Sequence, residues 1–197
     1  MSNIEFVNEG KSAVGKPDQR VIKKLEKLHP LPDSFLSFSE NHHGQIPVGG
    51  YVKGTKHRIG RFLSLIDEKS SLPGEFRPHF EDPSIDERVM RSIAAVIGFE
   101  SATSRALHYG ERLLPFAALY AGKNHPDEMC MDRYYVDFLC FDYERKESDP
   151  PVVLWISEKA NRDFMSFDDG EIENPNYKKF TIPIAKSFTD LLNILVE

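Results

Sequence analysis

The sequence has few cysteines and no long apolar run. Its 197 residues include two cysteines, Cys130 and Cys140, which are too few for a disulfide framework and form no Cys-x-x-Cys pair typical of zinc ribbons. We expect both to be small buried apolar groups. Apolar stretches such as residues 93–99 and 152–156 fall short of the ~18 residues that a membrane-spanning helix needs. Residues 1–11 lack the basic start and apolar core of a signal peptide, so we expect a soluble cytoplasmic protein with no membrane partner.

The sequence also has fewer basic than acidic residues. The 25 Lys and Arg residues are outnumbered by 31 Asp and Glu residues, giving a net charge of -6, which argues against a nucleic-acid partner. The charges are unevenly spread: residues 127–173 hold 14 acids and 5 bases, whereas residues 16–61 hold nine bases and four acids. An acidic and a basic end would suit an electrostatically steered encounter with a basic protein partner. A solvated surface without a partner is the alternative.

No complete catalytic or ligand-binding motif is present. Gly49 and Gly54 have the spacing of a phosphate loop, but Thr55-Lys56 follows where Lys and then Ser or Thr are required. No Gly-x-Ser-x-Gly elbow exists to expose a serine nucleophile. Among the seven histidines, the adjacent pair His42-His43 indicates a loop at a helix end better than a metal site. We therefore predict a protein that is not an enzyme and holds no cofactor or metal.

The hydrophobic pattern predicts an α+β domain over residues 18–197, preceded by a leader of residues 1–17 that is loose or forms an edge strand. We expect a mixed or antiparallel β-sheet packed by N-terminal and C-terminal helices. The first helix begins at an Asp18 cap and the last at a Ser187 cap. The predicted apolar stripes are Val21, Ile22, Leu25 and Leu28 in the first helix, Phe35, Leu36 and Phe38 in a second helix from Asp33 or Ser34, Val89, Ile93, Val96 and Ile97 in a third opened by Ser84, and Phe188, Leu191, Leu192 and Leu195 in the last. The predicted strands are residues 59–66, 113–119, 137–143 and 152–156.

Acidic residues near the ends of the predicted strands and in the following loop are the candidate partner-binding residues. The loop of residues 158–179 is acidic and carries Gly170 and Pro175, so we expect it to project from the sheet. Two acids in a cleft could also act as general acid and base, but adjacent ionised carboxylates favour an exposed loop. The candidate residues are Asp137, Asp142, Glu144, Asp168, Asp169 and Glu171.

Several ordered pieces of the chain resemble the SUKH superfamily, named for the yeast cell-wall synthesis regulator Smi/Knr. The chain departs from that pattern at Asn41-His42-His43-Gly44 and in an insertion between Ala118 and Asp137. The pieces are Ile22-Lys23-Lys24-Leu25-Glu26, Leu31-Pro32-Asp33-Ser34-Phe35, Leu113-Leu114-Pro115-Phe116-Ala117, Phe138-Leu139-Cys140-Phe141-Asp142-Tyr143, Pro151-Val152-Val153-Leu154-Trp155 and Ile184-Ala185-Lys186-Ser187-Phe188-Thr189-Asp190-Leu191-Leu192.

The resemblance implies an α+β fold and a role in protein binding. Bacterial members of the superfamily act as immunity proteins that bind and block a toxin domain, often a nuclease, and fungal members are regulatory scaffolds. We accordingly expect a non-enzymatic immunity protein that neutralises a basic toxin domain by occlusion through its acidic face. The alternative is a regulatory or scaffolding interaction module without a toxin. The sequence leaves the oligomeric state open.

Overall fold

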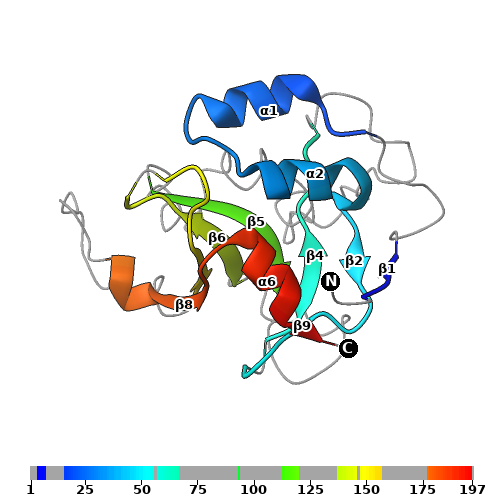
Figure 1. Ribbon diagram of the computed structural model, residues 1–197, viewed down its shortest axis with the longest axis vertical. Helices are drawn as coiled ribbons and strands as arrows, with labels where there is room; N and C mark the ends of the chain where they lie inside the picture. The colour runs from blue at the N-terminus through cyan, green and yellow to red at the C-terminus, as the bar shows by residue number, and fades with distance from the viewer. Residues whose placement is uncertain are drawn as a thin grey trace, which may run out of the picture.

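The computed structural model describes residues 4–7, 16–55, 57–66, 93, 112–119, 137–145, 147–156 and 177–196. Within them, helices and strands are combined in one α+β arrangement, as predicted (Figure 1). In chain order the elements are β1 (Phe6–Val7), α1 (Gln19–Glu26), α2 (Asp33–His42), β2 (Ile46–Pro47), β3 (Tyr51–Val52), β4 (Ile59–Phe62), β5 (Leu113–Leu119), β6 (Phe138–Asp142), β7 (Val152–Trp155), the 3-10 helix η4 (Tyr177–Phe180), β8 (Thr181–Ala185), α6 (Phe188–Ile194) and β9 (Leu195–Val196).

A five-stranded sheet in the order β4-β5-β6-β7-β8 forms the centre of the molecule. All of its strand pairs are antiparallel. Of the two sheet types that the sequence allowed, mixed or antiparallel, the structure therefore has the antiparallel one. Two small antiparallel pairs, β1-β2 and β3-β9, lie outside it. In Figure 1, α1 and α2 lie at one end of the molecule and α6 crosses in front of β5 and β6. The sheet is therefore covered by helices from both ends of the chain.

Helix α1 begins directly after its predicted cap, Asp18, but ends before Leu28, the last residue of the predicted apolar stripe. The Asp18 carboxylate accepts the Arg20 N–H at 2.8 Å, which satisfies one of the unpaired amides of the first turn. Val21, Ile22 and Leu25 are buried, as expected from their spacing. The prediction for Leu28 is wrong: the helix ends at Glu26, and Leu28 is 57% exposed. The final turn closes before Pro30, which cannot continue a helix.

Helices α2 and α6 pack on each other through aromatic side chains. The Ser187 hydroxyl accepts the Asp190 N–H at 3.1 Å and so caps α6 as predicted. The adjacent Phe188 is fully buried, and its ring centroid lies 5.3 Å from that of Phe35 in α2. Leu195, expected on the same helical face, is also buried, but it has left the helix and pairs in β9.

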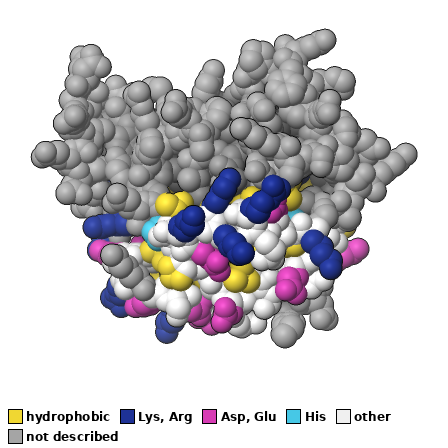
Figure 2. Space-filling view, turned by 90° about the horizontal axis from the view of Figure 1, so that it is seen from above, with side chains coloured by type: hydrophobic (Ala, Val, Ile, Leu, Met, Phe, Trp, Pro, Cys, Tyr) yellow, Lys and Arg dark blue, Asp and Glu magenta, His cyan; other side chains and the backbone are white. Residues whose placement is uncertain are grey.

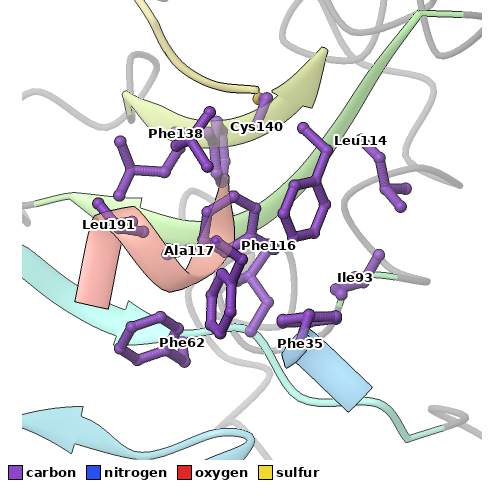
Figure 3. Close-up of a cluster of buried hydrophobic side chains, with 14 of the residues drawn as sticks. Phe35, Phe62, Ile93, Leu114, Phe116, Ala117, Phe138, Cys140 and Leu191 are labelled. Atoms are coloured by element: carbon purple, nitrogen blue, oxygen red, sulfur yellow. The ribbon is translucent and has the colours of Figure 1, made fainter. Parts of the chain in front are cut away.

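The core between these helices and the sheet is rich in phenylalanine. Figure 3 shows Phe35, Phe62 and Phe116 turned toward one another, and each is almost completely buried. The aromatic side chains of β6, β7 and the residue after β6 also pack in the core, since β5, β6 and β7 have no solvent-exposed face in the described part of the chain. These aromatics are Phe138, Phe141, Tyr143 and Trp155.

The structure adds an edge strand that the sequence analysis did not predict. β8 pairs with β7, and Pro183 in its centre lacks a backbone N–H. The exposed Lys178 and Lys179 precede the strand, and Lys186 follows it. Proline and lysine at an edge discourage pairing with a further strand.

Several sequence predictions lie outside the described residues. These are most of the helix opened by Ser84, the insertion after Leu119 and most of the acidic loop. Ile93, from the predicted stripe of that helix, is described, and it is helical and fully buried. Ile4 is also buried in the core, so part of the predicted leader packs against the domain through β1.

Candidate protein-binding site

Three of the six candidate acids are described, and they lie at the two ends of one strand. Asp137 precedes β6, and its backbone oxygen accepts the Leu119 N–H at 2.9 Å. Asp142 ends β6, and Glu144 follows in the connection to β7. The structure therefore brings Asp142 and Glu144 together and places Asp137 at the opposite end of the strand. Asp168, Asp169 and Glu171 lie outside the described residues.

Asp142 and Glu144 form the base of the β6–β7 hairpin. The Asp142 carboxylate accepts the Glu144 N–H at 3.0 Å, and Glu144 forms an ion pair with Lys178 at 2.7 Å. Burial raises the pKa of Asp142 above its usual value. The charge of Glu144 raises it further, whereas the Glu144 N–H and nearby Lys178 oppose the rise. Asp142 thus stabilises the turn through its hydrogen bond to Glu144, while the partial burial of its charged carboxylate costs free energy.

Tyr143 fixes this hairpin to the connection between α1 and α2. Its hydroxyl donates a 2.6 Å hydrogen bond to the Pro30 carbonyl oxygen. Its ring stacks on the buried His29 ring, with centroids 4.2 Å apart and planes inclined by 6°. Burial raises the pKa of the Tyr143 phenol far above its usual value, so the hydroxyl stays protonated and remains a donor. The hydrogen bond and the ring stacking therefore hold the β6–β7 hairpin against the connection between α1 and α2.

Exposed acids follow Tyr143 in the chain, and one exposed leucine precedes its stacking partner His29. Glu147 and Asp149 lie on the hairpin and are exposed, as is Arg145, and residues 142–151 together hold four acids and two bases. Leu28 immediately precedes His29, and its N–H donates to the Leu25 carbonyl oxygen at 2.8 Å. Leu28 is therefore exposed although its backbone is hydrogen-bonded to the end of α1. Sequence reasoning missed Leu28 because helical spacing placed it on the buried stripe, although the nearby Pro30 signals that the helix stops.

The helical face of the molecule carries both signs of charge. Viewed from the side of α1, the described surface shows Lys and Arg side chains interspersed with Asp and Glu and with apolar side chains (Figure 2). Part of this charge is paired within α1, where the Arg20 guanidinium lies 2.8 Å from the Asp18 carboxylate. That hydrogen-bonded pairing lowers the pKa of Asp18. Charge on this face alone does not define one docking site.

We predict that Asp142→Asn stabilises the protein at pH 7 by less than about 1 kcal/mol, because Asp142 is partly screened by solvent. Asparagine keeps an acceptor for the Glu144 N–H but removes the buried charge. Because the folded-state pKa of Asp142 is raised, the wild type loses stability relative to the variant as pH rises above the ordinary aspartate pKa. Urea unfolding at pH 7 and pH 3 measures the difference in free energy of unfolding between the wild type and the variant. We expect this difference only at pH 7. A less stable variant at pH 7 would show that attraction to Lys178 outweighs the cost of burial.

The described cysteine and the histidines of the α2 end make local packing and hydrogen-bond contacts. The described residues contain no group of three or more His, Cys, Asp or Glu side chains that could hold a metal ion. Cys140 is fully buried as predicted, and burial raises the pKa of its thiol well above the usual value, which disfavours the reactive thiolate. His42 contacts Phe6 and Phe38, and the His43 Nδ1 accepts the Leu65 N–H at 3.2 Å. Across the described segments, no helix has the length and apolar character needed to cross a membrane.

Comparison with known proteins gives one local similarity. The chain is 30% identical over 105 residues to phosphatidylserine decarboxylase proenzyme from Ehrlichia chaffeensis, which covers 48% of this chain and 46% of that protein. The chain thus spans about half the length of the curated relative that it matches. No protein-family profile matches the chain, and no solved structure matches it.

The resemblance to the SUKH superfamily is therefore wrong. No family profile supports it, and the curated similarity is to a protein of another kind. The structure gives two of the pieces that carried the resemblance a local role: Leu31-Pro32 joins two helices, and Ser187 caps the last one. Such capping and turn signals recur in unrelated folds. The α+β architecture, which the hydrophobic pattern predicted independently, is confirmed.

Proposed function

We propose that this chain is a non-catalytic protein-binding domain that blocks a basic partner protein by occlusion, with the acidic β6–β7 hairpin as its docking element. The observation that carries the proposal is the hairpin itself, whose exposed acids follow the buried anchor Tyr143. Complementary charge accelerates association, and a rigid element loses little conformational freedom on binding. A basic protein partner, the class expected from the uneven charge of the sequence, is complementary to this hairpin in charge.

An exposed apolar side chain next to His29 supports the same proposal. Interfaces gain most of their affinity from a few well-placed side chains that become buried, whereas charges at the rim mainly set the association rate. Leu28 is 57% exposed and directly precedes His29, whose ring stacks on Tyr143. We infer that Leu28 packs into an apolar site on the partner while Glu147 and Asp149 face its basic groups.

The local similarity to phosphatidylserine decarboxylase proenzyme favours a second candidate, a decarboxylase-related role. It covers about half of each protein, and the described residues include no cluster of titratable groups suited to a metal centre. Incubating the full chain with phosphatidylserine vesicles and measuring CO₂ release distinguishes the candidates. Release above the level of a heat-denatured sample would overturn the binding-only proposal.

The hairpin is tested by charge reversal. We expect Glu147→Lys with Asp149→Lys to lower capture of basic proteins from a low-salt lysate of the native cells by ~10-fold, because attraction becomes repulsion. The matched control is Glu26→Lys with Glu40→Lys, two exposed acids of α1 and α2 whose replacement changes the net charge equally. Equal losses in both variants would show an effect of net charge alone and contradict a role for the hairpin.

The blocking step is tested separately from binding. If the partner has an enzymatic activity, a stoichiometric amount of the chain should abolish it, and the hairpin variant should not. Binding without loss of activity would favour the regulatory or scaffolding alternative, which uses the same surface without occlusion.

A further inference from the structure

The short strands β3 and β9 build a second exposed surface. Val52 and Leu195 are partners in this antiparallel pair and are 1% and 2% exposed. Tyr51 and Val196, the other partners, are 43% and 42% exposed. Since opposite residues of an antiparallel pair lie on one face, Tyr51 and Val196 are side by side on the outer face. The pair therefore has a buried inner face and an apolar outer face.

Arg58 extends this row on the other side of Tyr51. The two residues form an antiparallel bridge, and the Arg58 guanidinium lies 5.8 Å from the centroid of the Tyr51 ring. The Arg58 Nε donates to the Gly49 carbonyl oxygen at 2.8 Å, so the guanidinium is held in place. Val48, three residues before Tyr51, is 42% exposed. We name Val48, Tyr51, Arg58 and Val196 the Tyr51 surface.

In the segment that carries most of this surface, every Asp, Glu, Lys or Arg residue is a Lys or an Arg. No Asp or Glu occurs between Glu40 and Asp67, a stretch that contains Lys53, Lys56, Arg58 and Arg61. Lys53 is exposed, and its N–H donates to the Ile194 carbonyl oxygen at 3.1 Å, next to β9. Glu5 approaches through its backbone oxygen, which accepts the Val48 N–H. Residues 41–66 thus carry a charge opposite to the net charge of the chain, and Glu197 follows Val196 in the sequence.

We propose that the Tyr51 surface docks an acidic segment of a partner protein. Tyrosine and arginine are over-represented among residues that dominate binding energy, and apolar neighbours supply the desolvated contact that such residues need. An apolar side chain of the partner packs against Tyr51 and Val196, and its carboxylates face Arg58 and Lys53. Nucleic acid fits less well, because single strands favour several aromatic platforms in a row, whereas valines flank Tyr51.

This surface is separate from the acidic hairpin. In Figure 1, β9 lies at the opposite end of the molecule from α1, whose C-terminal end precedes the contact with the hairpin. The two surfaces also have opposite charge. Either surface can therefore be disabled without removing the other, so one chain could bring together a basic and an acidic partner.

The proposal is tested with a short fluorescent peptide of alternating leucine and glutamate. Anisotropy titration of the full chain should show binding that Tyr51→Ala and Val196→Ser each weaken by ~10-fold. Ile182→Ala, which removes another exposed apolar side chain, is the matched control and should leave the affinity unchanged. The hairpin variant Glu147→Lys with Asp149→Lys should retain peptide binding, which separates this proposal from the proposed function.

Three outcomes would overturn the proposal. They are equal binding of a leucine and lysine peptide, tighter binding of oligothymidine, and unchanged affinity in both Tyr51→Ala and Val196→Ser. Sedimentation analysis adds a fourth, since self-association abolished by Tyr51→Ala would show that a second copy of the chain occupies the surface. An unchanged urea midpoint for each variant establishes that weaker binding does not arise from unfolding.

Discussion

Replacing Phe188 with alanine is expected to lower the free energy of unfolding by about 3–5 kcal/mol. Phe188 is fully buried at the start of α6, and its ring meets the rings of both N-terminal and sheet elements. Its centroid lies 5.3 Å from Phe38 and 5.5 Å from Phe116. Alanine would leave a cavity between the helices and the sheet, because close-packed neighbours collapse only partly into such a space.

The single tryptophan provides the measurement. Trp155 is fully buried in β7, so its fluorescence reports urea unfolding of the sheet. The control is Ile182→Ala, since Ile182 is 42% exposed on β8 and its replacement should change stability by less than about 0.5 kcal/mol. If Phe188→Ala is too unstable to purify, Phe188→Leu should show a smaller loss in the same direction. A loss below about 1 kcal/mol in Phe188→Ala would contradict the central position of this ring.

Gly50→Ala is expected to destabilise the protein by about 2–4 kcal/mol, through two separate costs. Gly50 has φ of 63°, a conformation in which a Cβ costs about 1–2 kcal/mol. A Cβ at this position would also lie 2.6 Å from Cγ of Pro47, part of a stiff ring that cannot move aside freely. The Gly50 carbonyl oxygen accepts the Ile59 N–H at 2.9 Å, so relief of this clash would disturb the start of β4.

Gly54→Ala separates the two costs. Gly54 has φ of 79°, but among the described residues no atom beyond its chain neighbours lies within 4 Å of an added Cβ. We expect a loss of about 1–2 kcal/mol from the backbone conformation alone. Chemical denaturation of both variants, monitored by Trp155, gives the difference. Equal losses would show that the contact with Pro47 relaxes at no cost.

The elements that the sequence predicted are those determined by local signals. Asp18 and Ser187 cap helices through atoms within three residues, and the apolar runs of β5, β6 and β7 need no distant information to be recognised as strands. β8 was missed because Pro183 interrupts it and its pairing depends on β7. Leu195 was assigned to the last helix because its pairing with Val52, far away in the chain, is not visible in local periodicity.

The same distinction applies to the candidate surfaces. Exposed acids near the end of β6 could be predicted, because a strand followed by charged residues indicates a solvated turn. The contact between Tyr143 and Pro30 could not be predicted, because the two residues are 113 positions apart in the chain and their hydrogen bond leaves no trace in sequence spacing. The Tyr51 surface likewise depends on the pairing of β3 with β9. Its one sequence signal is the absence of acids between Glu40 and Asp67.

The association rate of the chain with its captured basic partner, measured across a range of salt concentrations, tests the central proposal most directly. We expect a rate that falls steeply as salt rises, because screening removes long-range attraction. The variant carrying Glu147→Lys and Asp149→Lys should associate more slowly and depend less on salt than the control carrying Glu26→Lys and Glu40→Lys. A rate that is independent of salt, or that both variants lower equally, would contradict docking through the acidic hairpin.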